Sequence, residues 1–383
     1  MSKLIYPLFT LVGTIIGVGF FALPFLIWKV GILTLLIYFL VLGFVVKNIH
    51  YFYAQIALWT SENHRLPGYA KIYLGEKAEK IAAVQAVISF IGALLAYLVV
   101  GGGFLNNLFN SFIKTPDFAG PFIFFVLGAF LIVLGIRPIA KIELLAFLIF
   151  VAVLAVILKF GLPFWNLTNL FNFEKSWLFA PWGVVLFSLS GASLMPEIVE
   201  MVGRDQKLVQ RIIFLSIIIC SVFYLLFSIV IVGITGSLTT ADALSGLPYF
   251  FGNGILVLAF FLGFLTCFTS FITLGLTLKK ILAYDFYLSE KFALSLSLGA
   301  PLILYFSGFD DFLLIISIIG AFLLGIEGIL IVLIFLKAKE KVEGKIFSGL
   351  LSKSFFKNIL GPIFILIMLF LGILFEMNNL LNR

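Results

Sequence analysis

Two short stretches rich in glycine, serine and proline carry the residue types that would bind a small ligand through the main chain. The first is residues 13–19 (GTIIGVG), followed by Pro24, and the second is residues 188–193 (SLSGAS), followed by Pro196 and Glu197. Glycine and proline both weaken an α-helix, so each stretch predicts an interruption that leaves backbone N–H and C=O groups without helical partners. The chemistry predicted here is recognition of polar groups rather than bond breaking.

The side-chain chemistry of enzymes is sparse in this chain. Its only histidines are His50 and His64, and its only cysteines, Cys220 and Cys267, fall inside apolar segments. No Cys/His cluster has metal-ligand spacing, and no apolar segment carries paired aspartates or a Ser–His arrangement. We therefore expect a protein that is not an enzyme. A channel is disfavoured as well, because neither a repeated pore loop nor a ring of charge is visible.

The elements that position the two stretches are predicted to be membrane-spanning helices. Hydrophobic residues make up 63% of the 383 and charged residues 11%, and the mean hydropathy is +1.23. A soluble chain is about half apolar and a quarter charged. A helix crosses a bilayer with about 20 apolar residues, and the sequence predicts an all-α integral membrane protein with about eleven such spans. The spans lie near residues 4–28, 32–58, 81–108, 119–136, 138–160, 181–201, 208–235, 252–282, 291–308, 312–336 and 356–377.

The basic residues predict how the bundle is oriented. If the N-terminus is cytoplasmic, all but five of the 25 Lys and Arg residues fall on the inner side, as the positive-inside rule requires. The C-terminus is then outside, and we expect the plasma (inner) membrane. The net charge of +7 reflects this orientation, so we expect a lipid bilayer and a small molecule as partners, with no nucleic acid and no obligate protein partner. The five exceptions are Lys29, Lys114, Lys159, Lys175 and Arg383.

The two interruptions fall in spans 1 and 6, which stand five spans apart. Unwound backbone at mid-membrane depth is tolerated only where it lines a cavity or a ligand. The spacing predicts a single transporter domain built as a five-plus-five inverted repeat with broken helices 1 and 6. The first repeat would be 1–160, the second 181–336, and 356–377 an extra span 11. Glycines alone would equally indicate close helix packing, and the matching break in span 6 favours transport.

Residues 13–24 (GTIIGVGFFALP) resemble the span-1 signature of the amino acid–polyamine–organocation superfamily. Residues 187–197 (FSLSGASLMPE) and 269–280 (TSFITLGLTLKK) are similar to its span-6 and span-8 motifs. Within the superfamily, the chain resembles the amino acid/auxin permease family and the related bacterial aromatic and hydroxy amino acid permeases over nearly its whole length. The resemblance implies amino acid transport by alternating access.

The resemblance also implies where an amino acid binds. Its α-carboxylate would meet backbone amides of the span-1 break, and its α-amino group would meet carbonyls of the broken spans, such as those of Ser188 and Ser190. Tyr97, midway along span 3, would either cap the substrate or bond its hydroxyl inside the bundle. The substrate-binding residues expected in this way are Gly17, Val18, Gly19, Tyr97, Ser188, Ser190 and Gly191.

A coupling cation is implied between spans 1 and 8, where sodium-coupled relatives hold one. Five neutral oxygens would surround it, three from carbonyls and two from the adjacent hydroxyls of span 8. Such a set suits a monovalent ion better than Ca²⁺, which recruits carboxylates. The alternative is that these hydroxyls bond carbonyls of their own helix. The carbonyls are those of Gly13, Ile16 and Thr266, and the hydroxyls those of Thr269 and Ser270.

Proton coupling is the rival to sodium. Glu327 lies near the centre of span 10, where a charge costs about 2.5–3.5 kcal/mol, so it must be protonated, paired or facing water. It would carry a proton, bind a cationic substrate, or pair with Lys47 of span 2. Some proton-coupled relatives carry a lysine at mid-span 5, whereas here Lys141 and Lys159 stand near the two ends of that span. Glu197, at the inner end of span 6, is expected to act in gating.

The sequence thus predicts a secondary active transporter, a sodium-coupled symporter of a neutral amino acid. The alternatives are a proton-coupled amino acid permease and a non-transporting amino acid sensor on the same fold. Sensors often carry a long soluble extension, whereas residues 1–3 alone precede span 1. No cofactor is expected beyond the coupling ion, Na⁺ or H⁺.

Overall fold

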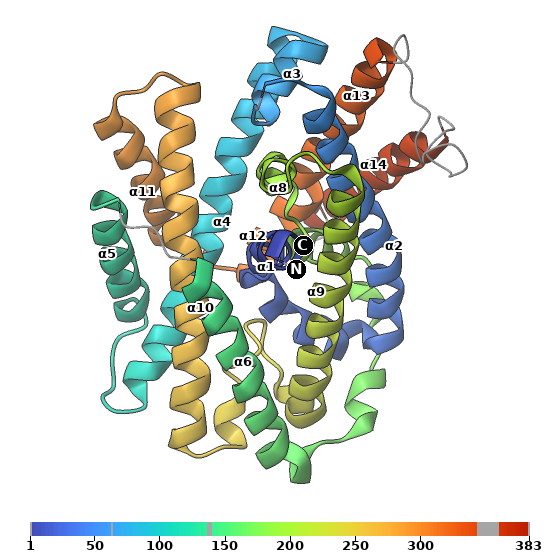
Figure 1. The fold of residues 1–383 in the computed structure, drawn as a ribbon. Coiled ribbons are helices and arrows are strands. Elements are labelled where there is room, and N and C mark those ends of the chain that lie inside the picture. Colours follow the sequence, from blue (N-terminus) through green and yellow to red (C-terminus); the bar gives the residue numbers. More distant parts are fainter. Residues whose placement is uncertain (1, 63, 136–139, 343–359, 382–383) are drawn as a thin grey trace.

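Helices account for the regular secondary structure of the chain. The computed structural model covers residues 2–62, 64–135, 140–342 and 360–381, and within these ranges it contains helices but no strand (Figure 1). Helices are what a chain this apolar must form, because backbone inside a bilayer has to satisfy its own N–H and C=O groups. The predicted all-α class is confirmed.

The longer helices are α1 (Ser2–Ile15), α2 (Leu23–Trp59), α4 (Glu76–Asn110), α5 (Ala119–Val133), α6 (Ala140–Gly161), α9 (Gln206–Thr235), α10 (Asn253–Lys280), α11 (Glu290–Phe306), α13 (Leu324–Val342) and α14 (Leu360–Leu381). Shorter α-helices are α3 (Leu66–Leu74), α7 (Pro181–Ser188), α8 (Met195–Met201) and α12 (Phe312–Ile318). The 3₁₀ and π turns are η1 (Val18–Ala22), η2 (Leu162–Phe164), η3 (Leu167–Phe171), η4 (Lys175–Trp177), η5 (Ala192–Leu194), η6 (Gly236–Leu238), η7 (Leu247–Tyr249), η8 (Ile281–Asp285) and η9 (Ile319–Leu323).

Each predicted apolar segment is mainly helical where it is described. Spans 1 and 2 meet in the single helix α2, which bends at Gly31, where a φ of 78° requires glycine. Within the described residues, seven helical stretches are long and apolar enough to cross a membrane, and there are shorter apolar helices as well. The number of eleven spans, the repeat boundaries and the orientation of the termini therefore stay predictions. Positions 136, 138–139 and 356–359 of spans 4, 5 and 11 lie outside the described residues.

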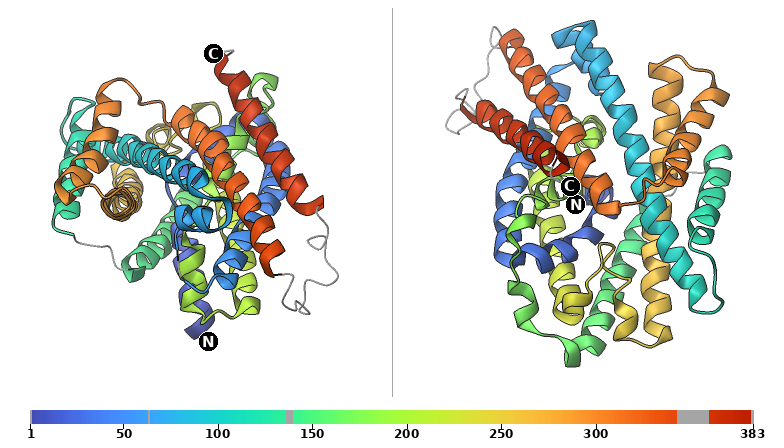
Figure 2. Two further views of the ribbon diagram at one scale, coloured as in Figure 1. Left: turned by 90° about the horizontal axis from the view of Figure 1, so that it is seen from above. Right: turned by 180° about the vertical axis from the view of Figure 1, so that it is seen from behind.

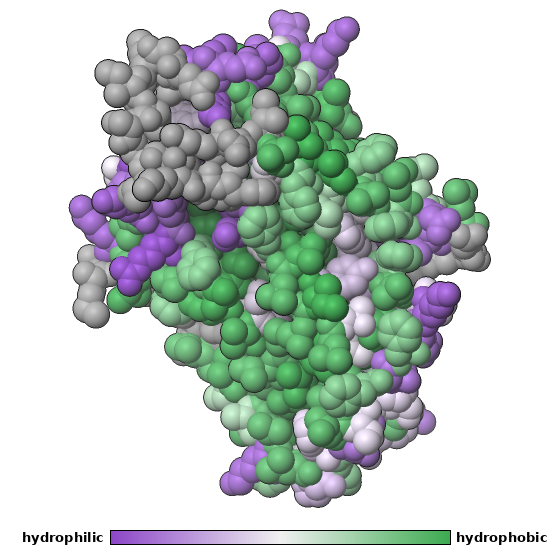
Figure 3. Space-filling view, turned by 90° about the vertical axis from the view of Figure 1, so that its right-hand side faces the viewer, coloured by the Kyte–Doolittle hydropathy of each residue, from purple (hydrophilic) through white to green (hydrophobic). Residues whose placement is uncertain are grey.

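The bundle has two distinct ends and an apolar girdle between them. Helix α3 lies at one end, which we call the α3 end, and η3 lies at the other, the η3 end (Figure 1). The surface between them is broadly apolar, with hydrophilic residues gathered toward the ends (Figure 3). On α2 the side chains of Ile37 and Leu40 are 61% and 75% exposed, as expected where lipid is the solvent. Helix α14 runs across the outside of the bundle (Figure 2), against α13 and α7.

Both predicted helix breaks are present. Helix α1 ends at Ile15, Gly17 is extended with φ −115° and ψ −152°, and η1 begins at Val18. Helix α7 ends at Ser188, and Gly191 leads into η5 and α8. A third irregularity is the π turn η9, which separates α12 from α13 in span 10. Broken helices 1 and 6 therefore agree with the predicted fold class.

An aromatic cluster closes the η3 side of the span-1 break. The rings of Phe20 and Phe21 from η1 pack edge to face against Phe227 of α9, with centroids 4.9 and 6.0 Å away. Phe21 also meets Phe104 of α4 at 4.9 Å, and Phe150 of α6 packs against Phe20 at 5.5 Å. All five side chains are buried, so this side of the bundle is closed.

Close packing of α4 against α5 depends on two glycines of the Gly101-Gly102-Gly103 run, because a Cβ on Gly101 would overlap Phe124 and one on Gly102 would overlap Pro121. A Cβ on Gly102 would overlap backbone and side-chain atoms of Pro121, whereas a Cβ on Gly103 would meet no atom within 4 Å. We predict that Gly102→Ala destabilises the fold by about 1–3 kcal/mol through overpacking. The matched Gly103→Ala is neutral or slightly stabilising, because alanine is the better helix former. Thermal unfolding of the two purified variants checks this, and equal melting temperatures would contradict the packing described.

Candidate substrate-binding site

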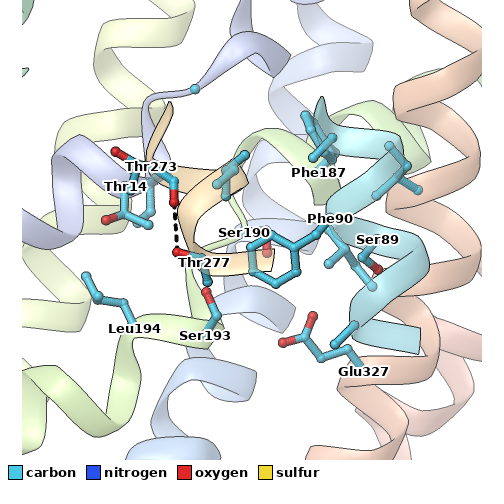
Figure 4. A pocket seen from close by; sticks show the side chains of 18 of the residues that line it. Thr14, Ser89, Phe90, Phe187, Ser190, Ser193, Leu194, Thr273, Thr277 and Glu327 are labelled. Carbon is cyan, nitrogen blue, oxygen red and sulfur yellow. Dashed lines mark hydrogen bonds between the residues drawn. The ribbon is translucent and has the colours of Figure 1, made fainter. Parts of the chain in front are cut away.

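A cavity of about 340 Å³ lies between the two helix breaks. Its walls come from both breaks and from α4, α10 and span 10, and it continues toward the α3 end, where Arg65, Leu66 and Pro67 line it. Figure 4 shows Phe90 and Phe187 beside the hydroxyls of Ser89 and Ser190, around the open space. The cavity is therefore mainly apolar with polar groups at chosen points, as small-molecule sites usually are.

The span-1 break fits closely against spans 3 and 6. The backbone N–H of Val18 donates to the Tyr97 hydroxyl at 3.2 Å. A Cβ on Gly17 would overlap that same hydroxyl, and a Cβ on Gly19 would stand 2.6 Å from Ser188 Oγ. Both glycines are therefore required by close approach of the chain to a neighbouring side chain.

The span-6 break is held from behind by a buried histidine. The N–H of Gly191 donates to His50 Nε2 of α2 at 3.1 Å, and the His50 side chain is 1% exposed. Accepting this bond requires the neutral imidazole, with its proton on Nδ1. A Cβ on Gly191 would meet Leu11 and Ile15 of α1, so the two breaks lie against each other.

The expected substrate-binding residues come together with one exception. Gly17, Gly19, Tyr97, Ser188, Ser190 and Gly191 all line the cavity, whereas Val18 is not among its described lining residues. The Val18 side chain is completely buried, and its N–H is directed at Tyr97. Two roles were expected for Tyr97, and the structure shows the second: its hydroxyl is hydrogen-bonded inside the bundle, at the edge of the cavity.

The expected cation ligands are only partly assembled in this state. Gly13 and Ser270 line the cavity, while Ile16, Thr266 and Thr269 are not among the described lining residues. The Thr269 hydroxyl lies 3.2 Å from the carbonyl oxygens of both Leu265 and Thr266 in its own helix, and its one hydrogen is donated to either of them. Helix α1 packs against α9, α6 and α8, whereas α10 packs against α4, α6, α11 and α5. The first half of span 1 thus stands apart from span 8.

Both candidate coupling acids face the cavity. The Glu327 carboxylate points into it (Figure 4), with Gln85 of α4 as a hydrogen-bond partner. Among the ion pairs of the described residues none joins Glu327 to Lys47. The Lys47 ammonium group lies 5.1 Å from the centre of the Phe44 ring. Glu197 lines the cavity near its α3 end, together with Arg65.

Three contributors to the site escaped the sequence analysis. His50 holds the span-6 break, Tyr224 of α9 contacts the carbonyl oxygens of Ile15 and Ser188, and Gln85 donates to Ser89 Oγ and to the Leu323 carbonyl. The available signal was a polar side chain inside an otherwise apolar span. That signal marks burial and need for a partner, but it does not say which partner is met.

The fold and the site define a class of protein, a membrane transporter with two interrupted helices. The structure matches MhsT in complex with L-phenylalanine, with a TM-score of 0.64 and 14% identity over 98% of this chain and 97% of that one. It also matches Mhp1, a nucleobase-cation-symport-1 family transporter in a closed conformation with bromovinylhydantoin bound, with a TM-score of 0.67 and 10% identity over 98% and 91% of the two chains. At such identities the likeness establishes the fold alone.

Residues 1–377 match the family model of the tryptophan/tyrosine permeases, and the chain belongs to the tryptophan/tyrosine permease family. No curated protein matches the sequence. The chain is therefore an integral membrane transporter rather than an enzyme. The resemblance to amino acid permeases and the five-plus-five fold with broken helices 1 and 6 are confirmed.

Gly17 provides a test of the span-1 geometry. We predict that Gly17→Ala lowers substrate uptake about tenfold, because an overlap of this kind costs on the order of 1–3 kcal/mol. Adding Tyr97→Phe removes the overlapping hydroxyl and leaves the ring Cζ 3.4 Å from the new Cβ. The double variant should therefore regain part of the uptake lost by the single variant. A double variant no better than Gly17→Ala would contradict the contact between Gly17 and Tyr97.

Proposed function

We propose that this permease imports a neutral amino acid by alternating access, and that its substrates include an aromatic one. The observation that carries the proposal is the cavity that joins the two helix breaks and continues toward the α3 end alone. The description of the family, and the L-phenylalanine bound to the structural neighbour MhsT, support an aromatic substrate. So does the lining of the cavity by Phe90, Phe187, Leu274 and Ile319.

The two breaks offer opposite partial charges to an amino acid. The turn η1 starts immediately after Gly17, so amides of this region present partial positive charge to an α-carboxylate. Helix α7 ends at Ser188, so its last carbonyls present partial negative charge to an α-ammonium group. Zwitterion recognition by main-chain groups leaves the side chain of the substrate to the apolar wall.

Alternating access requires the cavity to open at one end at a time. Here the aromatic cluster of Phe20 and Phe21 closes the η3 side, and the lining residues Arg65 and Thr277 extend the cavity to the α3 end. The distribution of basic residues favours a cytoplasmic position for the α3 end. We interpret the conformation as one that faces inward, with Glu197 and Arg65 at the position of an inner gate.

We further propose that sodium drives uptake through the site between spans 1 and 8. Hydroxyl oxygens that donate to a helix carbonyl still carry lone pairs, so the bonds of Thr269 leave it able to bind a cation. Separation of α1 from α10 suits the inward-facing state, in which the ion would have left. One charge moving inward gains about 2.3 kcal/mol per 100 mV, which suffices to concentrate a neutral amino acid.

Uptake into proteoliposomes tests the proposal. We expect purified protein to accumulate labelled L-tryptophan, L-tyrosine or L-phenylalanine under an inward sodium gradient and not when choline replaces sodium. Equal uptake in sodium and in choline would still support a transport function but would exclude sodium coupling. No uptake of any amino acid by folded protein would discard the proposed substrate class.

Thr269→Val tests the ion site directly. Removing one hydroxyl ligand should raise the sodium concentration for half-maximal uptake about tenfold, since a hydrogen bond or ligand to a charge contributes roughly 1.5–3 kcal/mol. Thr277→Val is the matched control, because Thr277 lies on the same helix and also bonds a carbonyl of that helix, at 2.8 Å. An unchanged sodium requirement in Thr269→Val, or an equal change in both variants, would remove Thr269 from the site.

Proton coupling through Glu327 is the second candidate, favoured by one observation. The carboxylate faces the cavity with an uncharged amide, Gln85, as its hydrogen-bond partner. If Glu327 carries the proton, Glu327→Gln abolishes the dependence of uptake on external pH. A wild-type pH profile in that variant would rule the role out.

A further inference from the structure

The hydroxyl of Tyr224 joins the two helix breaks. It lies 2.8 Å from the carbonyl oxygen of Ile15 and 2.9 Å from that of Ser188, although the three residues come from spans 7, 1 and 6. Ile15 is the last residue of α1, and Ser188 is the last residue of α7. A single side chain therefore contacts the ends of both half-helices.

The hydroxyl cannot satisfy both carbonyls at once. A tyrosine has one O–H hydrogen, so it donates to one carbonyl oxygen while the other faces a lone pair. Each carbonyl also ends a helix and carries the partial negative charge of that end. Two like partial charges thus converge on one proton. The Ile15 carbonyl also accepts from the N–H of Gly17 at 2.9 Å. Because a carbonyl oxygen has two lone pairs, whichever carbonyl the hydroxyl does not bind still has one for a further donor.

Both carbonyls belong to residues of the cavity wall. Ile15 and Ser188 line the cavity, whereas Tyr224 is fully buried behind them on α9. The Tyr224 ring is stacked on Phe20, with centroids 5.7 Å apart and planes 9° from parallel, and it also meets Phe39. These ring contacts fix the Tyr224 hydroxyl on the side of the two carbonyls that faces away from the cavity. A donor inside the cavity would approach the same carbonyls from the opposite side.

The geometry points to Tyr224 as a positioning residue for the ammonium group of the substrate. Its hydroxyl holds the two negative helix ends together. When an ammonium group donates to one carbonyl, the tyrosine O–H forms its hydrogen bond with the other carbonyl alone. The inference deepens the proposed function and rests on it, because it takes the substrate to be an amino acid. It assigns a role to a residue of span 7, whereas the sequence motifs concern spans 1, 6 and 8 only.

The experiment separates recognition of the ammonium group from general stability of the site. Affinities for L-tryptophan and for indole-3-propionate, the same molecule without its amino group, are measured on purified wild-type protein and on Tyr224→Phe. Tyr38→Phe is the matched control, because the Tyr38 hydroxyl of α2 donates to the Leu178 carbonyl at 2.8 Å, away from the breaks. Tyr224→Leu serves as a second hydroxyl-free variant if Tyr224→Phe does not fold.

We expect the hydroxyl-free variant to bind L-tryptophan about tenfold more weakly, since the helix ends separate without their shared proton. Its affinity for indole-3-propionate should match that of the wild type, and Tyr38→Phe should change neither affinity. An equal loss for both ligands, or no loss for L-tryptophan, would overturn the inference. Failure of the wild type to bind L-tryptophan, with binding of another amino acid such as L-tyrosine, calls for the same comparison with that ligand. Failure to bind any amino acid would instead overturn the proposed function.

Discussion

The structure depends on one constraint, which is that backbone groups inside a membrane must find partners. Two helices are broken in the middle of the bundle, and the groups released there are met by side chains from intact helices. Tyr97 of α4 accepts from Val18, His50 of α2 accepts from Gly191, and Tyr224 of α9 reaches the carbonyls that end α1 and α7. These partners make unwound backbone tolerable at this depth. They also leave selected amides and carbonyls available to a ligand.

The asymmetry of the cavity follows from where apolar and polar residues stand around the breaks. Rings of Phe20 and Phe21 fill the space on the η3 side, and apolar packing of this kind excludes water. Toward the α3 end the wall carries the charged residue types Arg65, Glu197 and Glu327, which are far more polar than the rings on the opposite side. A transport cycle must reverse this asymmetry, and the tight fit of the glycines against Tyr97 and Ser188 limits the ways in which the breaks can move.

Sequence reasoning located the two breaks and the glycines and serines that line the cavity at them, because glycine and proline act locally on the helix that contains them. It could not find His50 or Tyr224, since their roles depend on which helices become neighbours. It expected the backbone amide of Val18 to meet the substrate, whereas in the structure that N–H donates to the Tyr97 hydroxyl. Thr269 exemplifies a choice that sequence leaves open. Its hydroxyl can donate to a carbonyl of its own helix and still keep lone pairs for an ion.

The central claim is that the two breaks form the substrate site and that the site opens toward the α3 end. The most direct test is the rate at which a water-soluble maleimide modifies Ser190→Cys, with and without L-tryptophan. The native Cys220 and Cys267 are fully buried and give little background. The account predicts that Cys at this position reacts and that the amino acid slows the reaction. A rate unchanged by a saturating amino acid would contradict a substrate site at the breaks.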